Sequence, residues 1–599
     1  MAVETNDKKL SELLKWVEEG NAQLPEFQRD WVWDDSKICK LIESITSGYP
    51  MGAAMFLANG GENIRFKYRK FVGVSNNVNT EPEYLVLDGQ QRLTTLFQVF
   101  KCKAPVYTRL DTKRDKTIRR FYYLDIKKCL NPNEDRLDAI ISISDKKIIT
   151  SEIGRKIELD LTTPEKEYEN MMFPLNIVFS DKERDEWRWG FEDFEKDNKY
   201  IFRDFMTKIV YPILDYAMPV IKLDKQTPKE AVCQIFENVN TGGVPLTVFE
   251  LVTATFAADE YNLREDWQNI RKEFLNKKTD ILKEITGANF IAAMTLLVTY
   301  KKSLLGVGSV SCKKRDVLRL ELEDYRSNHD RLVEGFIDAA NFLVHQGIYR
   351  AQDVPYTTQL IPLAAIFAFD NEQTERKLNI KQNIDLLSQW YWCGVFGELY
   401  GGANEARFAV DIVSVFEWMN EGEKPDTVVR ANFQPTRLLS MQTRNSAAYK
   451  GVMALIMQDS PLDFMKGENM NIASYIDEET DIHHIFPQAY CENKYPQKKW
   501  NSVVNKTPIY ASTNRSIGGR APSEYVKTMK NKGLSDENVV KALESHKINS
   551  LLLMTDAFDE YFVDRAKQLL DRIEKAIGKS ISGRDSEETI REFGKSLCN

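Results

Sequence analysis

The sequence has 599 residues, of which 43% are hydrophobic and 28% charged, the proportions of an ordinary soluble globular protein with more than one domain. The N-terminus lacks an apolar signal-peptide core, and the longest apolar runs are shorter than the ~18 residues of a membrane helix, so we expect a cytoplasmic protein without a membrane partner. The eight cysteines are scattered without a C-x-x-C pair, which argues against a zinc ribbon and a disulfide framework.

The chain carries a net charge of −8, but many of its basic residues gather in two segments. Residues 494–532 hold nine Lys or Arg against one acidic residue, and residues 101–120 hold eight against two. Two basic segments on an acidic chain indicate restricted polyanion sites rather than general binding of nucleic acid. Each segment taken alone would also fit a solvated face.

The first part of the chain, residues 1–260, mixes predicted strands and helices. The stretch "WDDSKICKLIESITSGYP" predicts a helix that begins at an Asp or Ser cap and ends near Gly48 and Pro50. The stretch "EYLVLDGQQRLTTLFQVF" predicts a strand over 84–87, a Gly-containing turn and a helix. Two further helices are expected around "NVNTGG", the second with a capping box from Thr247 to Glu250.

The second part, residues 261–450, is dominated by helical periodicity, as in "ANFIAAMTLLVTYKKSLL" and "ARFAVDIVSVFEWM". We expect a helical layer that joins two active regions. The third part, residues 451–599, contains two adjacent histidines, the larger basic segment and a helical tail. The expected fold class is therefore α+β with several domains.

The turn "LDGQQRLTT" has the groups of a phosphate site. A strand that turns sharply into a helix presents free backbone N–H groups and the positive end of the helix dipole. Gly89 lets a ligand approach the backbone, and Arg92 can bind phosphate oxygens with two N–H groups. Asp88 could hold Mg²⁺ or orient water, and Gln90 or Gln91 could position an attacking water. A capped helix with polar surface residues would show the same pattern.

Three motifs in order, "LPEFQRDWVW", "LDGQQRLTTL" and "FENVNTGGVPLTVFELVTA", closely resemble the N-terminal domain of GmrSD-type restriction enzymes over roughly residues 10–256. The resemblance implies a ParB/sulfiredoxin-like fold that binds and hydrolyses a nucleoside triphosphate, without resolving GTP, ATP, UTP or CTP. No G-x-x-x-x-G-K-[ST] motif is present, so this site is not a P-loop. The implied nucleotide-binding residues are Gln28, Arg29, Asp88, Gly89, Gln90, Gln91, Arg92, Asn238, Asn240 and Thr241.

The stretch "DIHHIFPQAY" places two of the five histidines of the chain side by side. A nuclease that works at neutral pH needs a base to deprotonate water and a cation to stabilise the phosphorane and the departing oxyanion. A neutral imidazole, with an ordinary pKa of about 6.5, suits the first task. A second imidazole, a carboxylate or an amide oxygen can hold the metal.

Residues 481–526 resemble the HNH (ββα-metal) nuclease motif found at the C-terminus of GmrSD-type enzymes. The resemblance implies that His484 is the general base, that His483 and Asn514 are metal ligands with Asp481 as an additional or alternative ligand, and that Asn505 orients the loop and the base. An Asn at the last position favours Mg²⁺ or Mn²⁺. Strand alternation places His483 and His484 on opposite faces, so the base and ligand roles could be exchanged.

The leading functional hypothesis is a single-chain, modification-dependent (type IV) DNA endonuclease of bacterial defence against phage. Its expected partners are double-stranded modified DNA and a nucleotide. A homodimer fits, because a double-strand break needs two cuts, and nicking by a monomer fits equally. The alternative is a ParB-like DNA-binding or regulatory protein whose HNH domain nicks or is inactive. A third hypothesis, an RNA-directed or general toxic nuclease, agrees less well with the acidic net charge.

Overall fold

The computed structural model describes residues 3–26, 28, 30–31, 33–60, 66–111, 114–151, 156–227, 231–232, 247–276, 280–402, 404–470, 475 and 480–598. The chain divides into two compact units, an N-terminal unit (Met1–Asn262) and a C-terminal unit (Leu263–Asn599). The predicted α+β class is confirmed. The three domains expected at 1–260, 261–450 and 451–599, and the names of their folds, stay predictions. Within the described ranges, no helix has the length and apolar character needed to cross a membrane.

The N-terminal unit is built on a mixed six-stranded sheet with the order β1-β12-β3-β5-β2-β4. The pairs β12–β3 and β2–β5 are parallel, and the other neighbours are antiparallel. The strands are β1 (Val3–Lys9), β2 (Ala22–Pro25), β3 (Ala54–Ala58), β4 (Tyr68–Arg69), β5 (Tyr84–Asp88) and β12 (Ala217–Leu223).

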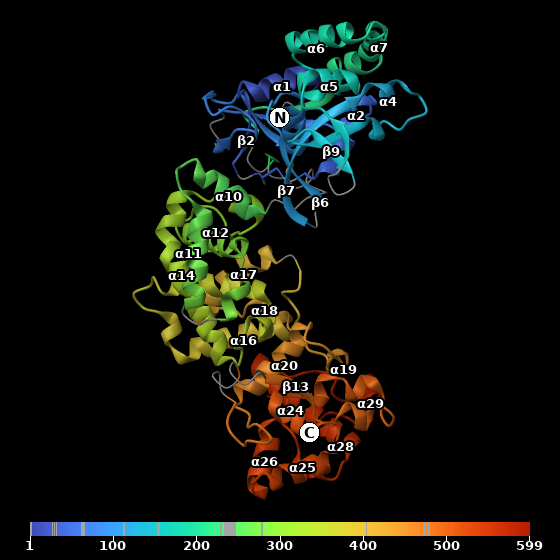
Figure 1. Ribbon diagram of the computed structural model, residues 1–599. Helices are drawn as coiled ribbons and strands as arrows, with labels where there is room; N and C mark the ends of the chain where they lie inside the picture. Colours follow the sequence, from blue (N-terminus) through green and yellow to red (C-terminus); the bar gives the residue numbers. More distant parts are fainter. Residues whose placement is uncertain are drawn as a thin grey trace. The chain divides into compact units, whose positions relative to one another are not determined.

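The charged segment after residue 100 forms a second, antiparallel sheet in which β7 is central and pairs with three strands (Figure 1). A separate two-stranded ribbon comes between the third and fourth strands of this sheet in the chain. These strands are β6 (Val106–Asp111), β7 (Arg114–Asp125), β8 (Ile140–Ser144) and β11 (Met172–Pro174), with the ribbon formed by β9 (Ile148–Ser151) and β10 (Lys156–Asp160).

Amphipathic helices cover the sheets of the N-terminal unit and form its main core with them, while a smaller cluster around Tyr123 and Ile143 lies in the antiparallel sheet. Helix α2 begins where the sequence predicts, because the side chain of Asp34 accepts a hydrogen bond from the Lys37 N–H at 2.9 Å. The helices are α1 (Leu10–Glu18), α2 (Asp35–Thr46), α3 (Gln90–Phe100), α4 (Ile126–Leu130), α5 (Pro164–Glu169), α6 (Asp181–Phe194), α7 (Asn198–Phe205), α8 (Tyr211–Leu214) and α10 (Val248–Ala257). The capping box of α10 is present as predicted, whereas most of the helix expected after Pro228 lies outside the described residues.

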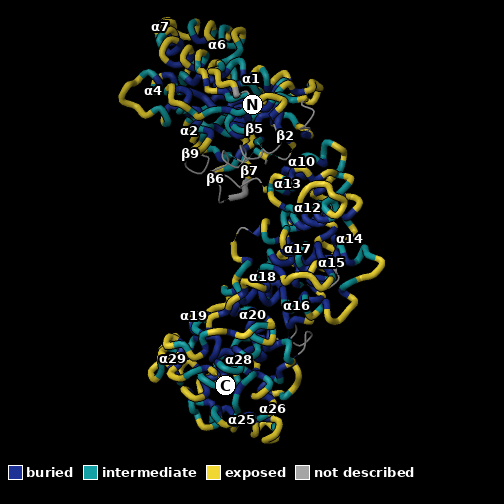
Figure 2. Tube along the Cα trace, turned by 180° about the vertical axis from the view of Figure 1, so that it is seen from behind, coloured by how far each residue is buried: buried dark blue, intermediate teal, exposed yellow. Residues whose placement is uncertain are grey.

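The C-terminal unit begins with a helical layer. Helix α15 is apolar all round, and nearly all of its residues are buried (Figure 2), because it packs among α12, α14 and α17. The helices of this layer are α11 (Leu263–Asn276), α12 (Gly287–Leu304), α13 (Lys314–Val317), α14 (Leu322–His345), α15 (Leu360–Asp370), α16 (Lys381–Phe396), α17 (Glu405–Met419), α18 (Asp426–Arg430), α19 (Arg437–Ser440) and α20 (Ala447–Gln458).

The rest of the C-terminal unit surrounds an antiparallel strand pair, β13 (Thr480–His484) and β14 (Lys506–Tyr510), which is followed at once by α24 (Ala511–Ile517). Helix α20 packs against β14 and against α28, and α28 also packs against α16. The remaining helices are α22 (Gln488–Cys491), α23 (Gln497–Trp500), α25 (Pro522–Asn531), α26 (Asp536–Ser545), α27 (Ser550–Met554), α28 (Phe558–Ile577) and α29 (Glu587–Phe593).

Candidate functional site

The adjacent histidines lie at the end of β13, opposite the start of β14. His483 pairs with Thr507, and His484 pairs with Lys506. Because side chains alternate along a strand, His483 shares a face with Asp481, while His484 belongs to the other face. The two imidazoles therefore have different neighbours.

His483, Asn514 and Asp481 form one chain of hydrogen bonds. The Nδ1–H of His483 donates to Oδ1 of Asn514 at 2.8 Å, and Nδ2 of Asn514 donates to Oδ2 of Asp481 at 3.3 Å. Asn514 comes from α24, so the turn from β14 into the helix brings the third side chain to the strand face. Three predicted ligands are thus within hydrogen-bonding reach of one another.

His483 is 4% exposed, and burial lowers its pKa to about 4. Its Nε2 is buried and has no hydrogen-bond partner among the described residues. An orphaned buried nitrogen is costly, but Nε2 points away from the ring edge that faces Asn514, so a cation held together with Asn514 would bind Nδ1 instead.

The donor types suit a hard divalent cation, because oxygens of Asn514 and Asp481 lie on the Nδ1 side of the His483 ring, and Nδ1 would bind the ion once the ring proton moves to Nε2. No group of three or more His, Cys, Asp and Glu side chains in the described part of the chain is placed to hold a metal ion. The set therefore depends on the amide oxygen of Asn514.

His484 lies in a different environment on the opposite face of β13. Its Nε2–H donates to Oδ1 of Asn501 at 3.1 Å, and its ring lies 5.7 Å from the ring of Trp500. Its Nδ1 has no hydrogen-bond partner among the described residues. Burial lowers the pKa of His484 below its ordinary value, the bond to Asn501 opposes this effect, and the Lys506 ammonium adds to the lowering. The imidazole is therefore neutral at pH 7.

Asn505 is fully buried and fixes the loop that follows the histidines. Its Oδ1 accepts from the Phe486 N–H at 2.9 Å, and its Nδ2 donates to the carbonyls of Phe486 at 2.9 Å and Trp500 at 2.8 Å. These three hydrogen bonds fix Phe486 and Trp500, which lie close to His484 and its partner Asn501 in the chain.

Two buried residues that the sequence did not single out hold the strand pair and α24. Asp463 accepts from the Thr513 hydroxyl at 2.6 Å and from the Tyr510 N–H at 3.1 Å. His546 accepts from the Thr507 hydroxyl at 2.7 Å. These contacts join residues 39 to 50 positions apart, and no local motif reveals them.

In the N-terminal unit, the "DGQQR" turn joins β5 to α3. Gly89 has φ +90° and caps α3, with Gln90 as the first helical residue. The guanidinium of Arg92 donates to the carbonyls of Met51 and Ala53 and, at 3.0 Å, to Oδ2 of Asp88. These three bonds hold Arg92 against the edge of the turn and leave it two further N–H groups.

Of the other predicted residues of this site, some lie close to the turn and others fall outside the described residues. Gln28 lies beside β5, where its Nε2 donates to the carbonyls of Val86 and Leu87, and its buried Oε1 has no partner among the described residues. Gln91 donates to the Asp30 carbonyl at 3.2 Å. Outside the described residues lie Arg29, Asn238, Asn240 and Thr241.

Two comparisons with known proteins agree with these observations. Residues 10–257 match the model of the GmrSD restriction endonuclease, N-terminal domain. The whole chain is similar to the uncharacterized protein MJ0686 of Methanocaldococcus jannaschii, with 30% identity over 586 residues that cover 92% of this chain and 93% of the relative. The chain therefore belongs to one family with this M. jannaschii protein, and its first 257 residues contain a GmrSD restriction endonuclease N-terminal domain.

Proposed function

We propose that the protein is a metal-dependent DNA endonuclease of the HNH type, controlled by a nucleotide bound to its N-terminal unit. The proposal rests on the different side chains that lie on the two faces of β13. One face gathers Asp481, His483 and Asn514, and the other presents the neutral imidazole of His484. The order strand, strand, helix supports the comparison with a ββα-metal nuclease.

His484 has the properties of a general base. Since its Nε2–H is held by Asn501, its Nδ1 lone pair is the atom that takes a proton from water. The lowered pKa keeps this lone pair free at neutral pH. Asn505 positions the base through the backbone of the loop and does not itself touch the reacting atoms.

Asp481, His483 and Asn514 would hold Mg²⁺ or Mn²⁺. When bound, such an ion stabilises the charge that develops on the phosphate and on the leaving oxygen. The pKa of about 4 keeps His483 neutral, and so available as a ligand, throughout the physiological range. This division of roles assigns the proton to His484 and the metal to His483.

The N-terminal unit is proposed to bind and hydrolyse a nucleoside triphosphate at the start of α3. Backbone N–H groups at the helix N-terminus, the side chains of Gln90 and Gln91, and the two remaining N–H groups of Arg92 would receive the phosphates. The buried Oε1 of Gln28, which has no partner among the described residues, supports a polar ligand at this edge. Arg29, Asn238, Asn240 and Thr241 are proposed to complete this site.

The substrate is proposed to be modified foreign DNA, with a role in defence against phage, because the matching family model describes a restriction endonuclease. A cleavage assay tests this. The full chain is incubated with Mg²⁺, each nucleoside triphosphate, and unmodified, glucosylated, hydroxymethylated or phosphorothioated DNA. We expect nucleotide-dependent cutting of one modified substrate. Equal cutting of all substrates without nucleotide refutes the modification and nucleotide dependence but not the nuclease.

Two variants separate the sites. His484→Ala should slow cutting about 10²–10⁴-fold but keep nucleotide hydrolysis, and Asp88→Ala should abolish hydrolysis. Unchanged cutting by the first, or unchanged hydrolysis by the second, refutes the corresponding assignment. DNA binding without cutting by the unaltered chain at any metal or nucleotide would favour the ParB-like regulatory protein instead.

A further inference from the structure

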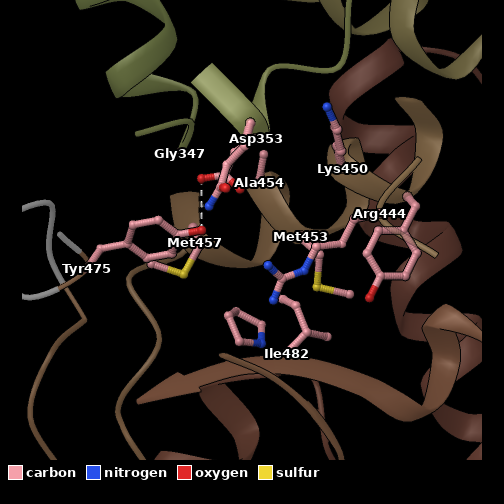
Figure 3. A pocket seen from close by; sticks show the side chains of 12 residues that line it. Gly347, Asp353, Arg444, Lys450, Met453, Ala454, Met457, Tyr475 and Ile482 are labelled. Atoms are coloured by element: carbon pink, nitrogen blue, oxygen red, sulfur yellow. Dashed lines mark hydrogen bonds between the residues drawn. The ribbon is translucent and has the colours of Figure 1, made fainter. Parts of the chain in front are cut away.

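A pocket lies on the His484 face of the β13–β14 pair, between the strands and the helical layer. Its floor is apolar and includes Met453 and Met457 of α20 with Ile482 and Pro508 of the two strands (Figure 3). Its polar lining is formed by Asp353, Arg444, Tyr449, Lys450 and Tyr475. The pocket is thus separate from the strand face that bears Asp481 and His483.

The cations of the pocket form no close ion pair among the described residues, although the carboxylates of Asp353 and Glu284 act on Lys450 electrostatically. Arg444 is exposed and makes no hydrogen bond or ion pair with any described residue. Lys450 donates only to the Val354 carbonyl at 3.0 Å, and the neighbouring Lys506, whose ammonium lies 5.9 Å from the Tyr449 ring, donates only to the Gln442 carbonyl at 2.7 Å. Three cationic side chains therefore surround one corner without forming an ion pair among the described residues.

The two nearby carboxylates, Asp353 and Glu284, do not cancel the charge of Arg350, Arg444, Lys450 and Lys506. Asp353 accepts from the Tyr475 hydroxyl at 2.9 Å and forms no ion pair with any described residue. Burial raises the pKa of Asp353, although Arg350, Arg444 and Lys450 act in the opposite direction. The pocket keeps a cationic excess that a bound anion would relieve.

The register of the strand pair relates the pocket to His484. Ile482 pairs with Pro508, and His484 pairs with Lys506, so the pocket begins two residues away from the base on the same face. A rise of ~3.3 Å per residue places it about 7 Å from the base along the strand. The ~3.4 Å rise of DNA runs along the helix axis, and the winding of the backbone places neighbouring phosphates of one strand roughly 7 Å apart, so this offset corresponds to about one nucleotide.

We propose that Arg444 and Lys450, with Lys506 beside them, bind a backbone phosphate of the DNA about one nucleotide from the phosphodiester that faces His484. The first turn of α20 contributes Tyr449 and Lys450, so the positive end of this 12-residue helix adds to the attraction. This inference rests on the proposed nuclease function and adds a second anchor for its substrate.

The test measures binding of a short DNA duplex by the full chain carrying His484→Ala, in which cutting does not interfere. Binding is followed from 50 to 200 mM salt, because the slope of log K against log salt becomes shallower by ~0.9 for each phosphate that the protein no longer neutralises. Adding Arg444→Gln should reduce the slope by about this amount and weaken binding about tenfold, as for a hydrogen bond to a charged group. Arg444→Lys should keep most of the slope.

Arg430→Gln is the matched control, because it removes one positive charge from an exposed arginine that already pairs with Asp426 at 2.7 Å. Its slope should equal that of the parent. If the parent binds DNA and Arg444→Gln leaves the slope unchanged, the phosphate subsite is refuted while the nuclease proposal stands. If the parent binds no duplex at all, the proposed function fails and the subsite with it. If Arg430→Gln weakens DNA binding as much as Arg444→Gln does, the loss comes from the lower net charge, and the subsite proposal is overturned.

Discussion

Acidification should destabilise the C-terminal unit through its buried histidines, and His546 offers the cleanest measurement. The imidazole is fully buried, receives the Thr507 hydroxyl on Nδ1 at 2.7 Å and donates from Nε2 to the Leu462 carbonyl at 2.9 Å. Burial lowers the pKa of His546 to about 3. The folded unit therefore holds this side chain neutral, whereas the unfolded chain protonates it near an ordinary pKa of about 6.5.

The sign and size follow from proton linkage. Because the unfolded state binds the extra proton, the stabilisation is complete above pH ~6.5 and is lost progressively as the pH falls toward 3. Between pH 7 and pH 5 the unfolded histidine gains most of one proton and the folded one gains almost none. The free energy of unfolding should fall by about 2 kcal/mol from His546 alone.

The assay compares urea unfolding at pH 7 and pH 5 for the unaltered chain and for His546→Gln, followed by hydrogen exchange of the β13 and β14 amides next to the imidazole. The variant starts less stable, but its further loss of stability on acidification should be smaller by about 2 kcal/mol. His345→Gln, at an exposed histidine, should lose as much stability as the unaltered chain. If His546→Gln also loses as much as the unaltered chain, the histidine is not held neutral and the prediction is refuted.

Three further predictions concern the sites themselves. His484→Ala should lower the single-turnover cleavage rate about 10²–10⁴-fold without changing DNA affinity, since a general base contributes that much; a rate equal to that of the unaltered chain contradicts the assignment. Lys506→Met removes the cation that lowers the pKa of His484, so the acidic limb of the kcat/KM profile should move to higher pH, and a limb that moves down excludes this coupling. Gly89→Ala places a side chain at φ +90° with its Cβ 3.2 Å from that of Ala54, which should lower the stability of the N-terminal unit by about 1–2 kcal/mol, measured as a fall in Tm.

Local patterns predicted the parts of the site that follow local rules. The alternation of β13 placed His483 with Asp481 and apart from His484, and the structure has the same arrangement. The Gly-containing turn before α3 and the capping box of α10 were equally readable, since propensity and capping act over a few neighbouring residues.

Contacts between distant segments could not be predicted in this way. The sequence indicated Arg92 as a phosphate ligand, but the structure ties its guanidinium to the backbone of residues 51–53. This approach needs Gly52, where a Cβ would lie 2.5 Å from Nη1 of Arg92. The roles of Asp463 and His546 also depend on partners far along the chain, which no periodicity records.

Helix α28 has a consequence for the order in which the protein is made. Its Arg565 donates to the Lys506 carbonyl at 3.0 Å, and its Tyr561 donates to the Val504 carbonyl at 3.2 Å. Strand β14 therefore lacks part of its support until residues up to 577 have left the ribosome. By then the N-terminal unit, with its own core, has long been synthesised. The order of synthesis thus completes the N-terminal unit before β14 gains its full support, so any nuclease activity at the strand pair would arise only after the N-terminal unit has been made.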